Sequence, residues 1–134
     1  MNKDIKNDIE TMAADSRSAA EKLAYAKSAR KERALEIMAD KILERSGSIQ
    51  TENQKDLKAG RENNLSDALL DRLELTRERI EKMAAGIREI IDLPDPVGRL
   101  LNSTDRDSGI HIEKISVPIG AIGIIYEARP NVTA

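Results

Sequence analysis

The 134-residue chain is about one domain long, which is enough to bury a modest core but short for a complete enzyme that binds two substrates. Its 22 Lys and Arg and 24 Asp and Glu residues are scattered along the sequence, a pattern that argues against a basic surface for nucleic acid or anionic lipid. The sequence contains no cysteine, no signal-peptide pattern and no apolar run near the roughly 20 residues that span a bilayer, so we expect a cytoplasmic protein without thiol nucleophiles of its own.

Amphipathic helices are predicted over residues 3–93, because apolar residues recur there at steps of three and four with charged residues between them. The first helix is expected to break near residues 15–18. Ser28 is a candidate N-cap for a second helix, and Gly47 is well placed to end that helix in the left-handed conformation. A shorter helix is then predicted for residues 48–59.

The last helix has the clearest start signal in the sequence. Thr76 is a good N-cap, Glu78 places an acid where the helix dipole favours it, and Leu75 can pack against Ile80 across the first turn. Ser66 is the candidate cap of a short helix just before it. The last helix should end at the sequence Leu-Pro-Asp-Pro, because each proline biases the preceding residue away from the helical region.

Strands are predicted after a connector that covers residues 94–109. Within residues 110–117 apolar and polar positions alternate, which is the period of a strand, and the alternation shifts by one residue after Glu113. A β-bulge or a sharp twist would explain that shift. The chain is therefore divided into a helical region of residues 1–93, the connector, and residues 110–134, in which a sheet begins.

The apolar run Ile-Gly-Ala-Ile-Gly-Ile-Ile at residues 119–125 suits a strand that is buried on both faces of a parallel sheet. Burying its isoleucines together with Val117 would be worth about 7–15 kcal/mol as an upper bound, close to the whole stability of a typical domain. Exposure of the run to water is therefore unfavourable, and we expect more chain or a partner to cover it.

Few residues taken by themselves indicate catalysis. His111 is the single histidine, and a lone imidazole on the polar side of a strand is typical of a surface or pairing residue rather than of a metal ligand or a base. Acidic pairs on the helices lie beside Lys and Arg, which is typical of solvated faces. The glycines of residues 120–123 do not form the Gly-x-Gly-x-x-Gly pattern of dinucleotide-binding turns.

A polar cluster at residues 126–133 follows the apolar run. Ligands bind at the carboxyl ends of strands in open parallel sheets, and Arg129 and Asn131 are residue types that recognise an anion or donate to an oxyanion. A structural alternative fits the pattern equally well. In that alternative the cluster is a polar turn, Arg129 pairs with Glu127, and Asn131 caps a following helix.

Three segments carry a family resemblance. Residues 117–133, Val-Pro-Ile-Gly-Ala-Ile-Gly-Ile-Ile-Tyr-Glu-Ala-Arg-Pro-Asn-Val-Thr, resemble the segment that distinguishes gamma-glutamyl phosphate reductases from other aldehyde dehydrogenases. The Asp-Arg-Leu-x-Leu sequence of residues 71–75 and the Leu-Pro-Asp-Pro-Val-Gly sequence of residues 93–98 resemble two further segments. The resemblance implies an α/β, aldehyde dehydrogenase-like fold. This chain would be its mainly helical N-terminal part, followed by an oligomerisation strand and the first Rossmann-like strand.

The resemblance implies an enzyme that reduces L-glutamate 5-phosphate to L-glutamate 5-semialdehyde with NADPH in proline biosynthesis. The family works through a cysteine thioester, and that cysteine belongs to a part of the family sequence beyond Ala134, so these residues alone should be inactive. The strands near residues 110–117 resemble the part that pairs subunits in a homo-oligomer. Glutamate 5-kinase is a candidate partner. A bifunctional kinase and reductase is an alternative origin, although the methionine start favours a monofunctional enzyme.

The resemblance also assigns roles to residues near the polar cluster. Asn131 is the candidate catalytic oxyanion donor and Arg129 the candidate substrate-binding residue, while Ile125, Tyr126 and Glu127 would face the cofactor. Asn131 lies farther from the strand than its counterpart in the wider superfamily, so an ungapped alignment places Arg129 there instead. Either side chain could therefore face the substrate.

A different class of function is also compatible with the sequence. The chain could be a non-catalytic helical interaction module whose exposed strand recruits a partner by edge addition. That alternative predicts a stable, soluble chain, whereas a fragment of the reductase predicts an oligomer, aggregation, or a disordered tail after Pro118.

Overall fold

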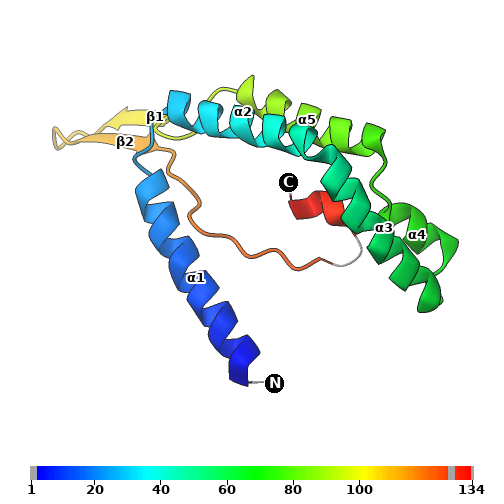
Figure 1. Ribbon diagram of the computed structural model, residues 1–134. Coiled ribbons are helices and arrows are strands. Elements are labelled where there is room, and N and C mark those ends of the chain that lie inside the picture. Colours follow the sequence, from blue (N-terminus) through cyan, green and yellow to red (C-terminus); the bar gives the residue numbers. More distant parts are fainter. Residues whose placement is uncertain (1–2, 127–128, 134) are drawn as a thin grey trace. The chain divides into compact units, whose positions relative to one another are not determined.

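The computed structural model describes residues 3–126 and 129–133 (Figure 1). Its elements are α1 (Lys3–Leu23), α2 (Ser28–Glu44), α3 (Ser46–Glu62), α4 (Asp67–Leu73), α5 (Arg77–Ile91), β1 (Leu100–Asp105), β2 (His111–Ile115) and the 3-10 helix η1 (Pro130–Thr133). They form two compact units: the hairpin unit contains residues 1–28 and 94–123, and the helical unit contains residues 29–93 and 124–134. None of the described helices combines the length and hydropathy needed to cross a membrane.

The core of the helical unit lies between α2 and α5, which run side by side in Figure 1. Ala39 of α2 is buried with Ala84 and Ile87 of α5, and such small side chains allow two helices to approach closely. At the edge of this contact the guanidinium of Arg88 lies 2.6 Å from a carboxylate oxygen of Asp40. This core is therefore formed by apolar residues of the two helices that recur with the predicted helical period.

Gly60 allows α4 to pack closely against α3. A Cβ atom at this position would lie 3.0 Å from Leu70 Cδ2 and 3.2 Å from Leu65 Cδ1, so a larger residue would force these side chains to move. The turn that follows passes through Asn64, whose φ of 56° is left-handed. The helix predicted for residues 48–59 is longer at both ends, since α3 covers Ser46–Glu62. At its C-terminal end Gly60 is buried inside the helix and does not end it.

Two predicted features of the helices are wrong. α1 is continuous through residues 15–18, where the ion pair between Arg17 and Glu21, at 3.5 Å, joins successive turns. Gly47 does not end a helix, because it lies in the first turn of α3. The corner between α2 and α3 is made by Arg45 with φ −95° and ψ 10°, a conformation that needs no glycine.

The start of α5 is as predicted. Thr76 Oγ1 accepts a hydrogen bond from the backbone N–H of Arg79 at 3.2 Å, which satisfies one donor of the first turn. Leu75 and Ile80, the predicted hydrophobic pair, are both buried. Ser66 precedes α4 as predicted, although its side chain makes no capping hydrogen bond.

The strands β1 and β2 form an antiparallel hairpin. The register pairs Asp105 with His111 near the turn and Leu100 with Ile115 at the far end, and both strands are exposed along their whole length. Leu101 is the extra residue at an irregularity in β1. A bulge was expected in the segment that forms β2, so the irregularity lies in the opposite strand.

The prediction that residues 94–109 form a connector is wrong in one part, because the strand β1 lies within them. The Asn-Ser-Thr centre of β1 is polar and both faces are exposed, so the sequence shows no alternation that would indicate a strand. Gly109, with φ 82°, makes the turn to β2, and its N–H donates to the carbonyl oxygen of Arg106 at 2.8 Å.

Residues 116–126 continue from β2 as extended coil (Figure 1). Their apolar side chains face water: Ile119 is 91% exposed and Ile122 is 68% exposed. The strand predicted for residues 119–125 is not formed in this structure, because a strand needs a neighbour for its backbone hydrogen bonds and the described strands, β1 and β2, pair with each other.

Candidate functional site

A cleft of about 450 Å³ lies in the helical unit at the corner between α4 and α5. We call it the α4–α5 cleft. Its size falls within the roughly 300–1,000 Å³ of small-molecule sites. The residues that line it come from the end of α4, the α4–α5 connection, the first half of α5 and the segment around η1: Asp71, Arg72, Glu74, Leu75, Arg79, Lys82, Met83, Arg129 and Asn131.

The backbone at this corner is fixed by Asn53 of α3. The Asn53 side chain is 3% exposed, its Nδ2 donates to the carbonyl oxygen of Leu73 at 2.8 Å, and its Oδ1 accepts from the N–H of Leu75 at 2.7 Å. One buried amide thus satisfies a donor and an acceptor of the α4–α5 connection. Asn53 was not among the residues predicted from the sequence. Its signal was a polar residue at helical spacing between Ile49 and Leu57 on the inner face of α3.

Arg79 joins the end of α4 to α5. Its Nη2 lies 2.8 Å from Asp71 Oδ1, and its Nη1 donates to the carbonyl oxygens of Asp71 and Glu74, the latter at 2.9 Å. A guanidinium with several acceptors around it is held in one orientation. The charge of Arg79 is therefore engaged within the protein, and its role at the cleft is to position the connection.

Lys82 is engaged with a residue one turn before it on α5. Its ammonium lies 2.8 Å from Glu78 Oε1. This hydrogen bond, and then the positive charge of Lys82, hold the pKa of Glu78 below its ordinary value of 4.5. Lys82 therefore contributes little uncompensated charge to the cleft.

Three charged side chains of the cleft have no ion pair among the described residues. They are Arg72 at the end of α4, Glu74 in the α4–α5 connection and Arg129 just before η1. Arg72 and Arg129 are exposed and Glu74 is half-buried. The cleft therefore presents two guanidinium groups and one carboxylate to a ligand.

The two strongest sequence candidates, Arg129 and Asn131, lie together at this cleft. In the structural alternative Asn131 caps a following helix. Among the described residues Asn131 lies inside the short helix η1, where the carbonyl oxygen of Arg129 accepts the N–H of Val132 at 3.1 Å. The alternative pairing of Arg129 with Glu127 lies outside the described residues. The structure thus joins the predicted site to α4 and α5, which the sequence alone did not indicate.

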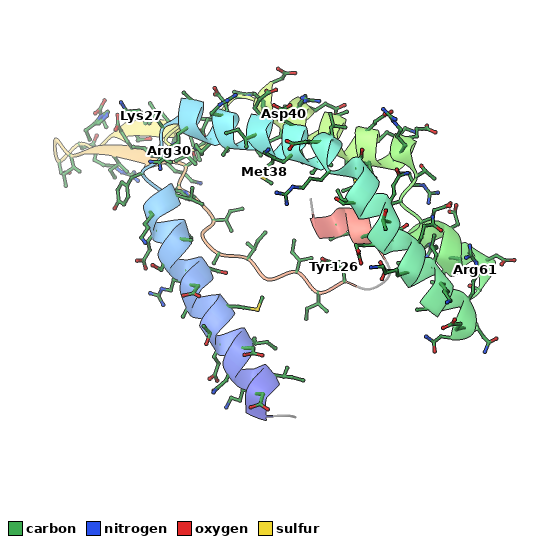
Figure 2. The ribbon with its side chains drawn as sticks, in the orientation of Figure 1. Lys27, Arg30, Met38, Asp40, Arg61 and Tyr126 are labelled. Carbon is green, nitrogen blue, oxygen red and sulfur yellow. The ribbon has the colours of Figure 1, made fainter. Side chains whose placement is uncertain are left out.

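Of the predicted cofactor-facing residues, Ile125 and Tyr126 do not line this cleft. Ile125 is 103% exposed and Tyr126, labelled in Figure 2, is 48% exposed, while Glu127 lies outside the described residues. Both described side chains are therefore accessible to a ligand in this chain.

His111 lies in a polar cluster on the hairpin. Its Nδ1 is 2.7 Å from Asp105 Oδ1, and its Nε2 is 3.2 Å from Ser103 Oγ and 3.5 Å from Glu113 Oε1. Ser, His and Asp form the triad of many hydrolases, but there the triad works beside a substrate pocket with oxyanion donors. Every residue of β1 and β2 is exposed, so His111 is a cross-strand pairing residue, as predicted.

No group of three or more His, Asp or Glu side chains is placed to hold a metal ion in the part of the chain that the structure describes.

Comparison with curated proteins gives one consistent name. No protein-family model matches the chain, but many curated proteins do. The gamma-glutamyl phosphate reductase of Rhodospirillum rubrum is 52% identical over 118 residues, which cover 88% of this chain and 28% of that protein. The protein of the same name from Haemophilus influenzae is 46% identical over 125 residues, or 93% of this chain and 30% of that protein.

Solved structures give the same result. The crystal structure of the gamma-glutamyl phosphate reductase of Thermotoga maritima matches with a TM-score of 0.86 and 40% identity, over 90% of this chain and 29% of that chain. That of the Saccharomyces cerevisiae protein matches with a TM-score of 0.86 and 29% identity, over 92% and 31%. The chain thus spans about 30% of the length of the relatives it matches.

Proposed function

Because this chain matches the N-terminal portion of gamma-glutamyl phosphate reductases, we propose that it is the N-terminal part of an oxidoreductase that reduces L-glutamate 5-phosphate to L-glutamate 5-semialdehyde in proline biosynthesis. The observation that carries the proposal is the agreement of sequence and fold over about nine tenths of the chain.

The chemistry of this reaction requires groups that the chain does not contain. In the proposed mechanism a cysteine thiolate displaces phosphate from the acyl phosphate to form a thioester. These residues contain no cysteine, so that thiolate would belong to another part of the enzyme. NADPH, when bound, supplies the hydride that reduces the acyl group. The accessible side chains of Ile125 and Tyr126 fit a role in binding that cofactor.

The chain contributes groups that bind and orient the substrate. The amide of Asn131 can donate to the oxyanion that develops when the thiolate attacks, and the guanidinium of Arg129 can pair with an anionic group of the substrate. The presence of both residues at one cleft supports these roles. Which of the two faces the oxyanion is decided by the substitution Arg129→Ala. If Arg129 binds substrate, this change raises the Michaelis constant more than it lowers the turnover number.

We also propose that the complete enzyme is a cytoplasmic homo-oligomer. The hairpin supports this, because its strands are exposed and its outer edges offer backbone groups for pairing across a subunit boundary. A glutamate 5-kinase is the class of partner that would supply the acyl phosphate substrate.

A helical interaction module is the second candidate function. It is favoured by the exposed apolar residues between Val117 and Ile125, which a partner strand could cover by edge addition. This candidate requires no catalysis and no cysteine from outside the chain, so an activity measurement separates the two functions.

The test uses a hybrid reductase, in which this chain replaces the matching residues of the Rhodospirillum rubrum protein. The reverse reaction is measured, the NADP-dependent oxidation of glutamate 5-semialdehyde in phosphate, for the hybrid, its parent and the 134-residue chain alone. We expect activity in the hybrid and parent and none in the chain alone. A hybrid with the circular dichroism spectrum and oligomer size of its parent, but without activity, would contradict the proposal and favour the interaction module.

A further inference from the structure

We propose that Arg72 and Glu74, together with Arg129, bind the charged groups of the substrate in the α4–α5 cleft, with the guanidinium groups on its oxyanions and the carboxylate on its ammonium group. The inference rests on the proposed function and extends it to two residues of α4 and its connection. The side chains of both residues are available to a ligand, since neither has an ion pair or a hydrogen bond among the described residues.

The charges that remain in the cleft match this class of ligand. Arg79 and Lys82 are paired with Asp71 and Glu78, so the unpaired groups are two cations and one anion. A phosphorylated amino acid carries the opposite set, because it has a carboxylate, a phosphoryl group and an ammonium group. Guanidinium groups bind carboxylate and phosphate through two parallel hydrogen bonds, whereas a single carboxylate suits the ammonium group.

The backbone that carries Glu74 is fixed by buried structure. Glu74 lies between Leu73 and Leu75, whose backbone groups are held by the Asn53 side chain at 2.8 and 2.7 Å. The carbonyl oxygen of Glu74 also accepts from Arg79 Nη1 at 2.9 Å. A site that is fixed before the ligand binds loses less conformational entropy on binding. The α4–α5 connection therefore presents Glu74 to the cleft from a fixed backbone.

The oxyanion that these arginines bind could belong to the substrate or to the phosphate groups of the cofactor. The reverse reaction separates these sources, because its three reactants are glutamate 5-semialdehyde, inorganic phosphate and NADP. The semialdehyde carries the carboxylate and the ammonium group, and phosphate is a separate reactant. A Michaelis constant measured for each reactant thus reports which group an arginine or Glu74 contacts.

The experiment measures the three constants in the hybrid reductase and in Arg72→Gln and Glu74→Gln. Loss of a hydrogen bond to a charged group should raise the affected constant about tenfold or more. We expect Arg72→Gln to raise the constant for phosphate or for the semialdehyde and to leave that for NADP unchanged. Glu74→Gln should raise the constant for the semialdehyde alone. Arg61→Gln, on the exposed side of α3 and outside the cleft (Figure 2), is the matched control and should change none.

Other outcomes overturn the proposal. If Arg72→Gln changes only the constant for NADP, the arginine binds the cofactor, and if it changes none the cleft is not the substrate site. If Arg72→Gln fails to fold, Arg72→Lys keeps the charge but loses the paired hydrogen bonds, and it should still raise the same constant.

The proposal can also be separated from the proposed function. If the unsubstituted hybrid is inactive, calorimetric titration with inorganic phosphate and with L-glutamate is performed on it and on its variants. Binding of either probe that is weakened by Arg72→Gln but not by Arg61→Gln supports the cleft although the reductase activity is absent. Absence of both activity and binding contradicts both proposals.

Discussion

The core of the helical unit and the extended segment after β2 contain similar apolar residues but differ in burial. Ile80 of α5 is fully buried, whereas Ile119 and Ile125 are 91% and 103% exposed. The reason is the backbone. A helix satisfies its own N–H and C=O groups, so α2 and α5 need only a complementary apolar face, and each provides that face for the other. An extended segment also needs neighbouring strands for its backbone.

The core of the helical unit and the extended segment therefore differ in the source of their stability. The helices α2 to α5 are stabilised by contacts within these residues. The extended segment, by contrast, is an apolar surface whose burial would require a further strand. In the proposed reductase that strand belongs to the rest of the enzyme, and in the proposed interaction module it belongs to a partner. Three substitutions test the comparison.

The largest effect is expected for Ile80→Ala. The change leaves a cavity in the helical unit, and such cavities cost about 2–5 kcal/mol of the free energy of unfolding. Ile90→Ala on the same helix is the matched control, because Ile90 is 52% exposed and its truncation should cost far less. Urea unfolding of the 134-residue chain measures both. Equal losses for the two variants would show that the core lies elsewhere.

An intermediate effect is expected for Asn53→Ala. The carbonyl oxygen of Leu73 and the N–H of Leu75 would lose their partner, and an unsatisfied buried group costs about 1–3 kcal/mol. Gln54→Ala, an exposed amide beside it on α3, should change the free energy of unfolding by less than about 0.5 kcal/mol. If Asn53→Ala were as mild as Gln54→Ala in urea unfolding, the corner at the cleft would not depend on Asn53.

The smallest effect in this chain is expected for Ile125→Ala. The side chain is fully exposed, so its truncation should change the free energy of unfolding by less than about 0.5 kcal/mol. In the hybrid reductase the same change should destabilise the protein more, because the segment would be buried there. Thermal unfolding of both proteins compares the two cases. A large loss in the 134-residue chain, or equal small losses in both, would contradict the distinction between the regions.

Several features of the fold were predictable because they depend on neighbouring residues. The start of α5 follows from a hydroxyl at Thr76 and an apolar pair across one turn, and the structure has both. Gly47 was misleading because a glycine permits the end of a helix but does not require it. β1 was not predicted because both of its faces are exposed, and its sequence therefore lacks the alternation of apolar and polar residues that indicates a strand.

The candidate site was predictable only in part. The polar cluster at Arg129 and Asn131 was indicated by its place after an apolar run, a pattern confined to one segment. Arg72 and Glu74 lie in the Asp-Arg-Leu-x-Leu segment of residues 71–75, but nothing in that segment indicates that the polar cluster lies beside it. Asn53 was missed because a single amide on a helix is usually exposed, and only the packing of α3 against the connection buries it.

The sequence by itself determined which segments are helical, because periodicity and capping depend on residues within one or two turns. It also determined the absence of a thiol nucleophile. Only the tertiary structure decided that α4, α5 and the segment around η1 share one cleft, and which of its charges are already paired. Those facts depend on contacts between residues far apart in the chain, which have no local signal in the sequence.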